Sequence, residues 1–307
     1  MCGVLSRGSC LSPCALRVGV QSCRAVPRLR TVPPMPQPER LESWHGALAQ
    51  RQRGTAAASV RALIRSYGDG SFASLVITDT RSRYWVKVIG NPQGDQVLVT
   101  ETVVAGAGRL IGAPVRPTAL LTIPLSLDGT QYGPTRRESW HAGVAHASLH
   151  LDGALEDDHI LHPRRGSNPQ RRARLLVLWE WCLGADAQWL YETSSSDAIW
   201  SFDHGFWLGG EGSDWDIPTL TRLVREPWPW ADKTAGIDAD EALRCASRLR
   251  TVTVEEILDV LAAVPVAWGV PDSDLEALGW FLYNRRSTVA DRVGHAYSSR
   301  PTATGRG

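Results

Sequence analysis

Lysine is almost absent from this chain of 307 residues. Of its 33 lysine and arginine side chains, only Lys87 and Lys233 are lysine, as expected from a GC-rich genome. In that background, a retained lysine indicates a position that arginine cannot fill, because an ammonium is a compact point charge and a guanidinium is a wide planar fork. The ordinary alternative for Lys87 is an exposed lysine on a strand, with its ammonium in water.

Cysteine is scarce beyond the first 23 residues, where only Cys182 and Cys245 remain. No pair of cysteines has the spacing of a zinc ribbon, and we therefore expect a reducing, cytoplasmic environment. No stretch reaches the roughly 18 uninterrupted apolar residues of a membrane-spanning helix. We expect no association with a membrane.

Acidic residues are missing from residues 1–34, which contain five arginines. This composition fits either a transit peptide or a start site placed too early, and we favour Met35 as the true start. We expect residues 1–40 to be a disordered or spurious leader. The rest of the chain has 28 basic and 32 acidic residues. Without a basic stripe, it is not expected to bind nucleic acid.

The first half of the remaining chain has the pattern of a small sheet with one helix. β-branched and aromatic residues predict strands near 60–65, 72–78, 84–89 and 119–123. Apolar residues from Val97 to Ile111 predict a helix that ends at Gly112 and Pro114. The short turns between the first three strands predict an antiparallel meander.

The second half is predicted to be mostly helical. Helices are expected near 169–183, 239–250, 254–264 and 274–286, with a short hairpin of 189–191 and 199–202. Thr253 with Glu256, and Ser273 with Glu276, have the spacing of capping boxes. The sequence therefore predicts an α+β fold, with a sheet-rich lobe at 41–124, a helical lobe at 125–297 and a disordered tail at 298–307.

Four charged residues have the order expected of a phosphotransferase. Lys87 lies on a predicted strand, and Glu101 follows on the next helix, so the carboxylate can orient the ammonium toward phosphates. Asp186 and Asp203 lie 17 residues apart, with Asp203 at a strand end before His204 and Gly205. A kinase requires one aspartate near the acceptor hydroxyl and a second aspartate that binds magnesium.

A glycine-rich turn precedes the Lys87 strand. Gly68, Gly70 and Ser71 surround Asp69, and such glycines let backbone amides approach phosphate oxygens closely. The alternative is an ordinary hairpin turn, in which Asp-Gly is a favoured pair.

On these residues the sequence resembles the bacterial HipA-like kinases over about residues 58–290. The segments that carry the resemblance are Tyr84-Trp85-Val86-Lys87, Gly90-Asn91-Pro92-Gln93-Gly94, Glu101, Arg109 to Pro114, Ala185 to Tyr191, and Ser201-Phe202-Asp203-His204-Gly205. The resemblance implies a two-lobed protein-kinase-like fold, with a small antiparallel sheet in the N-lobe and a helical C-lobe.

The resemblance also implies the chemistry of the site. Lys87, paired with Glu101, would bind the phosphates of ATP, and the turn of Gly68, Gly70 and Ser71 would cover them. Asp186 would be the catalytic base, and Asp203 would bind Mg²⁺. The segment 122–125 would lie near adenine. The γ-phosphoryl group would pass to a hydroxyl of a protein serine or threonine, so a protein substrate or partner is expected.

One position departs from the family pattern. The asparagine expected five residues after Asp186, a second metal ligand, is replaced by Tyr191, a poor ligand for magnesium. Gln188, in the same loop, offers an amide oxygen instead. The alternative to an active kinase is therefore a catalytically weak pseudokinase that binds nucleotide and acts through a partner protein.

A third interpretation rests on histidine. Five of the eight histidines lie in one segment, at His141, His146, His150, His159 and His162. If this segment were helical, His146 and His150 would share a face and could bind a metal, as in a metal-dependent hydrolase. The segment is instead expected to be a loop, with its histidines around the mouth of the cleft between the two lobes.

Overall fold

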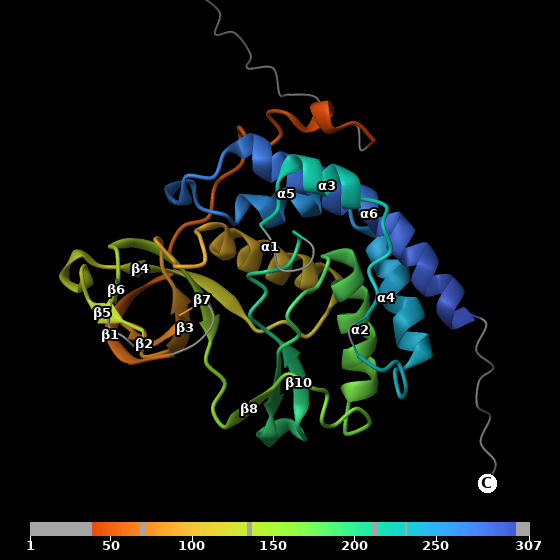
Figure 1. The fold of residues 1–307 in the computed structure, drawn as a ribbon, viewed down its shortest axis with the longest axis horizontal. Helices are drawn as coiled ribbons and strands as arrows, with labels where there is room; N and C mark the ends of the chain where they lie inside the picture. Colours follow the sequence, from red (N-terminus) through yellow and green to blue (C-terminus); the bar gives the residue numbers. More distant parts are fainter. Residues whose placement is uncertain (1–38, 68–71, 134–136, 210–213, 231, 299–307) are drawn as a thin grey trace, which may run out of the picture. The chain divides into compact units, whose positions relative to one another are not determined.

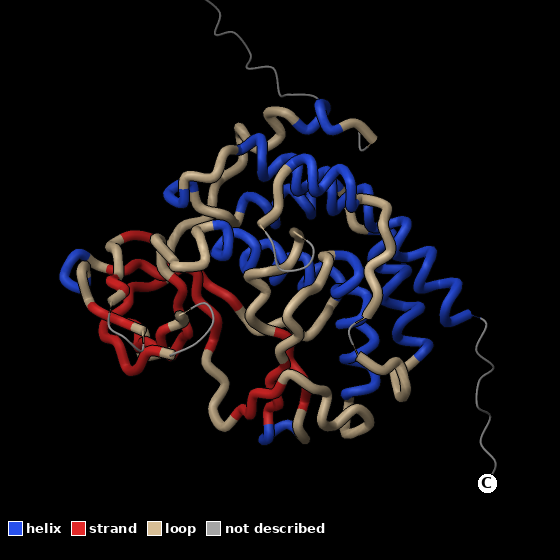
Figure 2. Tube along the Cα trace, viewed as in Figure 1, coloured by secondary structure: helices blue, strands red, loops and turns tan. Residues whose placement is uncertain are grey.

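The fold of this chain is mixed α/β. The computed structural model describes residues 39–67, 72–133, 137–209, 214–230 and 232–298, all of which belong to one compact unit. Figure 1 follows the chain through this unit, and Figure 2 shows that the strands form separate groups beside the helices. No helix in these ranges is long and apolar enough to cross a membrane.

The larger group of strands is a closed barrel in the order β1-β2-β3-β7-β4. Its strands are β1 (Ala58–Ser66), β2 (Ser74–Thr78), β3 (Arg83–Lys87), β4 (Thr118–Ile123) and β7 (Gly143–Leu149). Neighbouring strands are antiparallel except β1 and β4, whose parallel pairing closes the barrel. Alternate side chains, among them Val60, Val76, Val86 and Leu121, fill its interior.

The barrel differs from the predicted meander because of β7, which lies in the segment expected to be a loop. This strand pairs with both β3 and β4. Its sequence, Gly-Val-Ala-His-Ala-Ser-Leu, has little of the β-branched enrichment that indicates a strand. Hydrogen bonding to β3 and β4 therefore determines that this segment is a strand, although its own residues do not predict one. The sheet thus includes residues on both sides of the predicted boundary at 124.

Helix α1 (Gln96–Ile111) agrees with the predicted helix and is buried along most of its length. Two glycines let other elements approach it closely. A Cβ at Gly106 would lie 2.7 Å from Val260 of helix α5 (Val254–Ala262), and one at Gly108 would lie 2.6 Å from Val115. Gly112 ends α1 with a positive φ of 69°, the left-handed conformation that favours glycine at this position.

The remaining helices pack together in the second half of the chain. They are α2 (Asn168–Trp181), α3 (Ile217–Leu223), α4 (Ala239–Thr251), α5 (Val254–Ala262) and α6 (Asp272–Ser298). Figure 1 shows α2, α4 and α6 side by side, in agreement with their mutual contacts. Their apolar faces and most of the buried tryptophans form one core with α1.

One predicted capping box is confirmed, and the other is wrong. Thr253 and Glu256 cap the start of α5 reciprocally. Ser273 caps nothing, because α6 already begins at Asp272. The carboxylate of Glu276 instead accepts hydrogen bonds from the backbone amides of Gly46 and Leu48, each 3.0 Å long. Glu276 therefore fastens the segment after the short 3₁₀ helix Leu41–Trp44 to α6.

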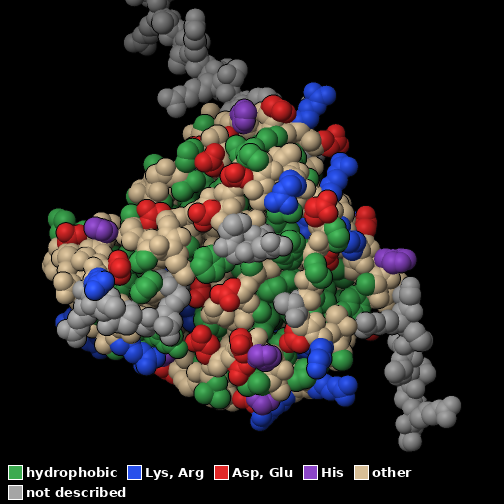
Figure 3. Space-filling view, in the orientation of Figure 1, with side chains coloured by type: hydrophobic (Ala, Val, Ile, Leu, Met, Phe, Trp, Pro, Cys, Tyr) green, Lys and Arg blue, Asp and Glu red, His purple; other side chains and the backbone are tan. Residues whose placement is uncertain are grey.

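A smaller sheet lies beyond the barrel, in the order β10-β9-β8. Strands β9 (Trp189–Glu192) and β10 (Ala198–Ser201) form the predicted hairpin, and β8 (Ala154–Asp157) pairs with β9. A further two-stranded sheet joins β5 (Gln131–Tyr132) and β6 (Glu138–Ser139). On the face in Figure 3, acidic side chains lie near the centre and most basic ones near the rim.

Candidate functional site

Lys87 is buried, with only 6% of its surface exposed, and so the exposed-lysine alternative is wrong. Because side chains alternate along β3, Val86 enters the barrel and Lys87 points the other way, toward α1. Its Nζ lies 2.5 Å from Glu101 Oε1 and 2.5 Å from Asp203 Oδ1. Burial lowers the pKa of Lys87, but Asp203 and Glu101 outweigh burial and raise it above its usual value.

Glu101 comes from the buried face of α1 and is 2% exposed. Its second oxygen lies 3.4 Å from Nδ1 of His204. Burial raises the pKa of this carboxyl, but Lys87 and His204 hold it well below its usual range. Glu101 is therefore an anion that fixes the position of the Lys87 ammonium.

Asp203 follows β10 and has a positive φ of 54°. The next residues hold this turn against α1. His204 is buried and lies 2.9 Å from Ser201 Oγ, with its ring edge-on to Trp207. A Cβ at Gly205 would lie 2.8 Å from Val97, so only glycine allows this approach. The turn thus brings Asp203 to Lys87 across 116 residues of chain.

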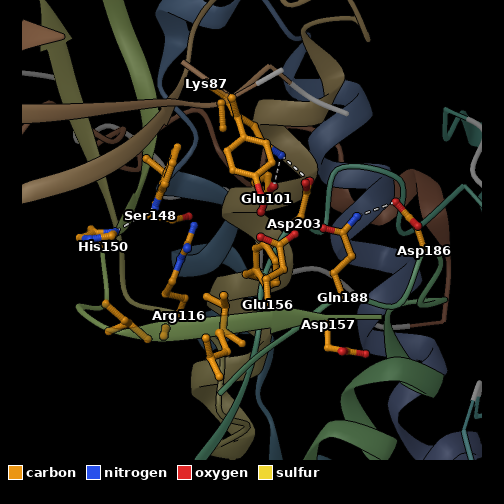
Figure 4. Close-up of a pocket in the computed structure, with 18 of the residues that line it drawn as sticks. Lys87, Glu101, Arg116, Ser148, His150, Glu156, Asp157, Asp186, Gln188 and Asp203 are labelled. Carbon is orange, nitrogen blue, oxygen red and sulfur yellow. Dashed lines mark hydrogen bonds and ion pairs between the residues drawn. The ribbon is translucent and has the colours of Figure 1, made fainter. Parts of the chain in front are cut away.

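Asp186 and Gln188 lie in the loop between α2 and β9. Asp186 is exposed and has a positive φ of 48°. The amide nitrogen of Gln188 donates to Asp186 Oδ2 over 2.9 Å, and Figure 4 shows the amide oxygen on the side of Asp203. Carboxylate and amide oxygens of this kind suit magnesium.

Tyr191 does not face the site. Its hydroxyl donates to the carbonyl of His159 over 2.8 Å and accepts from the amide of Leu161 over 2.9 Å. Burial raises the pKa of Tyr191 to about 12, so the phenol stays protonated. The position five residues after Asp186 therefore supplies no ligand to the cavity.

A cavity of about 700 Å³ connects these residues. Lys87, Glu101, Asp186, Gln188 and Asp203 all line it, and Figure 4 shows them converging from different elements. Its size is that of a pocket for a small molecule or cofactor. Gly68, Gly70 and Ser71 lie outside the described residues.

The cavity wall agrees with the sequence analysis in one respect, since His146 and His150 of the histidine segment line it, and differs from it in others. The segment predicted to lie near adenine, 122–125, is not among the residues that line the cavity, whereas His150, Leu151 and residues 154–158 are. Arg116 and Glu156 also face it. Arg116 lies between Pro114 and Pro117, just before β4, where nothing but its charge distinguishes it.

His146 and His150 do not form the metal-binding pair of the third interpretation. His146 belongs to β7 and is buried, with Nδ1 3.1 Å from Thr102 Oγ1, while His150 accepts from the indole of Trp85. Among the described residues, the side chains close enough to share a metal are Asp157, Asp158 and His159, and the last two are exposed. His146 and His150 are not in this group.

Comparison with known proteins gives a result for the fold alone. No family model matches the sequence, and no curated protein does so significantly. The proinflammatory kinase CtkA of Helicobacter pylori aligns with a TM-score of 0.52 at 12% identity, over 79% of this chain and 96% of CtkA. The described residues therefore have a kinase-like fold.

Two structures of the Golgi casein kinase also align, one of them with Mn and ADP bound. Each alignment has a TM-score of 0.43 and covers 85% of this chain. The first structure is 10% identical in sequence, with 76% of the kinase covered. The structure with Mn and ADP is 8% identical, with 78% of the kinase covered.

Proposed function

We propose that this chain is a HipA-like, ATP-dependent kinase with two lobes, the first of which extends past the predicted boundary at residue 124 to include β7. The observation that carries the proposal is the bridge of Lys87 to both Glu101 and Asp203 inside a cavity large enough for a nucleotide. A buried ammonium between two carboxylates, beside a further aspartate, suits a polyphosphate with its magnesium better than an apolar ligand.

In the proposed reaction, the acceptor is a serine or threonine hydroxyl of a protein. Its oxygen attacks the γ-phosphorus of ATP, the bond from that phosphorus to the β–γ bridging oxygen breaks, and ADP leaves. Asp186 accepts the hydroxyl proton, and its exposure at the cavity rim leaves room for a protein substrate. Lys87 holds the phosphates.

Asp203 and Gln188 would hold Mg²⁺, which supplies charge neutralisation on the phosphates when bound. The carboxylate of Asp203 faces the cavity, and the amide oxygen of Gln188 is on the same side. A cytoplasmic location, with its supply of ATP, fits this proposal.

Tyr191 favours a second candidate function, a pseudokinase that binds nucleotide and acts through a partner protein. Its hydroxyl is engaged with two backbone groups, so one of the two metal positions depends on Gln188 alone. Phosphotransfer, measured by mass spectrometry, distinguishes the two. An active kinase incorporates phosphate into itself or into an added protein, and Asp186→Asn abolishes this incorporation. A pseudokinase incorporates no phosphate, and Asp186→Asn therefore changes nothing.

The proposal is tested by calorimetric titration of the full chain with ATP, with and without magnesium. We expect magnesium to strengthen binding, and Asp203→Asn to lower the affinity for Mg-ATP by about 10- to 100-fold, because a charged ligand becomes neutral. The exposed Asp240→Asn on α4 is the control and should bind as wild type does. Absence of any ATP binding by the wild-type chain would overturn the proposal.

A further inference from the structure

Arg116 is a buried cation in the wall of the cavity, with 8% of its surface exposed. Its backbone is fixed next to the Asp203 turn: the Arg116 amide donates to the Ser201 carbonyl over 3.1 Å, and the Ser201 amide donates to the Pro114 carbonyl over 2.9 Å. Pro117, directly after Arg116, and Pro114, two residues before it, restrict the segment further. Figure 4 shows the side chain pointing into the cavity from this anchored segment.

The guanidinium of Arg116 stacks on the ring of Phe202, with Cζ 5.2 Å from the ring centroid, but it lacks the hydrogen-bond partners that other buried arginines have. Arg285 donates to the carbonyls of Glu180, Leu223 and Glu226, and Arg172 donates to those of Lys233 and Ala235. Nε of Arg116 has no hydrogen-bond partner, and none of the hydrogen bonds or ion pairs between described residues involves its other two nitrogens. A buried donor group of this kind costs free energy until a ligand satisfies it.

The charges around Arg116 compensate it only in part. Burial lowers its pKa to about 10, although Glu101, Asp203 and Glu156 act in the opposite direction. Glu101 and Asp203 are the same carboxylates that bind Lys87. The two cations therefore face one part of the cavity, and an anion placed there would interact with both.

We infer that Arg116 is a second phosphate-binding cation, which contacts the phosphates of the nucleotide held by Lys87. This inference rests on the proposed function and adds a residue to the phosphate-binding site beyond Lys87, Glu101 and Asp203. The planar guanidinium can donate two parallel hydrogen bonds to phosphate oxygens, whereas the ammonium of Lys87 acts as a point charge. The geometry thus assigns recognition of the phosphate chain to two side chains from β3 and from the segment before β4.

A purely structural role for Arg116 makes a different prediction about stability. If Arg116 held the fold together, its replacement would destabilise the ligand-free protein, as expected for Arg285 with its satisfied hydrogen bonds. If its role is to bind phosphate, replacement by the uncharged methionine removes an unsatisfied buried charge. The ligand-free Arg116→Met variant should then melt at or above the temperature of the wild type.

The test is a titration of the full chain with Mg-ATP, inorganic pyrophosphate and adenosine, for wild type, Arg116→Met and Arg116→Lys. We expect Arg116→Met to lower the affinity for ATP and pyrophosphate by about 10- to 100-fold and to leave adenosine binding unchanged. Arg116→Lys should recover part of the loss. Arg83→Met is the matched control, because Arg83 lies on β3 outside the cavity lining and pairs with Asp152.

Each other outcome has a distinct meaning. Wild-type affinity of Arg116→Met for ATP and pyrophosphate would overturn the inference and leave the proposed function intact. An equal loss for adenosine, or a clearly lower melting temperature, would show that Arg116 shapes the cavity and would also overturn it. If the wild-type chain binds no ATP, the proposed function fails first. If Arg116→Met does not fold, the Arg116→Lys variant provides the test. A pyrophosphate affinity of this variant equal to that of the wild type would contradict the two parallel hydrogen bonds from Arg116 to phosphate.

Discussion

His146 is a buried base directly beside the charged cluster, on the residue of β7 that pairs with Lys87. Burial lowers its pKa to about 4, against a usual value near 6.5, and the cations Lys87 and Arg116 act in the same direction. The ring is therefore neutral at physiological pH. In this state it can hydrogen-bond to Thr102 without adding charge next to Lys87.

This pKa predicts a pH dependence of folding stability. Between pH 6.5 and 4 the unfolded chain binds a proton at His146 that the folded chain does not, so acidification lowers the free energy of unfolding, by about 3 kcal/mol over the interval. Above pH 6.5 His146 contributes no pH dependence. Urea denaturation at a series of pH values should show a shallower fall for His146→Gln than for wild type, whereas the exposed His45→Gln should follow the wild type.

Lys87 could be selected from the sequence because lysine is rare in this chain, and Glu101 and Asp203 could be selected from their order after it. Lys87 stood out among arginines, and the structure brings it together with Glu101 and Asp203. Their catalytic roles stay predictions. Arg116 could not be selected in this way, because the chain uses arginine at almost every basic position and one arginine does not differ from the others in sequence. Its significance lies in missing partners, which only the folded chain reveals.

Among the helices, α1 is the element on which the two halves of the chain converge, and its glycines set how closely they pack. Gly106 lies against Val260 of α5, and an added Cβ would be 2.7 Å from that side chain. Gly294, in α6, has no other atom within 4 Å of such a Cβ. The two glycines thus differ in packing but share a helical backbone.

We expect Gly106→Ala and Gly294→Ala to change stability in opposite directions. At Gly294 alanine should raise the free energy of unfolding by up to about 1 kcal/mol, through helix propensity alone. At Gly106 the overlap with Val260 should outweigh that gain and lower stability by roughly 1–2 kcal/mol. Urea denaturation of both variants measures the difference. Equal effects at the two sites would contradict close packing of α1 on α5.

Helices were easier to predict than strands in this chain. The long apolar pattern of α1 and the caps of α5 are local signals, and both elements begin and end close to the expected residues. Strand β7 lacks such a signal, and its place is determined by pairing with β3 and β4. The start of α6 was misplaced because Glu276, which has the spacing of a capping residue, contacts a segment 228 and 230 residues away.

That long-range contact determines how the first described segment joins the rest of the compact unit. Trp44 is fully buried against the core, next to Gly279 of α6, and Glu276 binds the amides of Gly46 and Leu48. A buried carboxylate that accepts two backbone hydrogen bonds fixes the segment in one position.

Loss of this carboxylate should release the segment. Glu276→Ala leaves two amides without their acceptor and is expected to lower the free energy of unfolding by about 2–4 kcal/mol. Limited proteolysis should then cut near residues 41–50 faster than in wild type. The exposed Glu255→Ala on α5 is the control and should resist the protease as wild type does. Unchanged proteolysis of Glu276→Ala would mean that Trp44 alone anchors the segment.

The parallel pairing of β1 with β4 affects whether another polypeptide can add a strand to the barrel. It involves only Ala58 with Leu121 and Ser59 with Thr122, yet it gives every strand of the barrel two neighbours. An open five-stranded sheet would expose an edge to which a second chain could add a strand, a common route to aggregation. Two residue pairs at β1 and β4 thus protect the whole barrel from growth by strand addition.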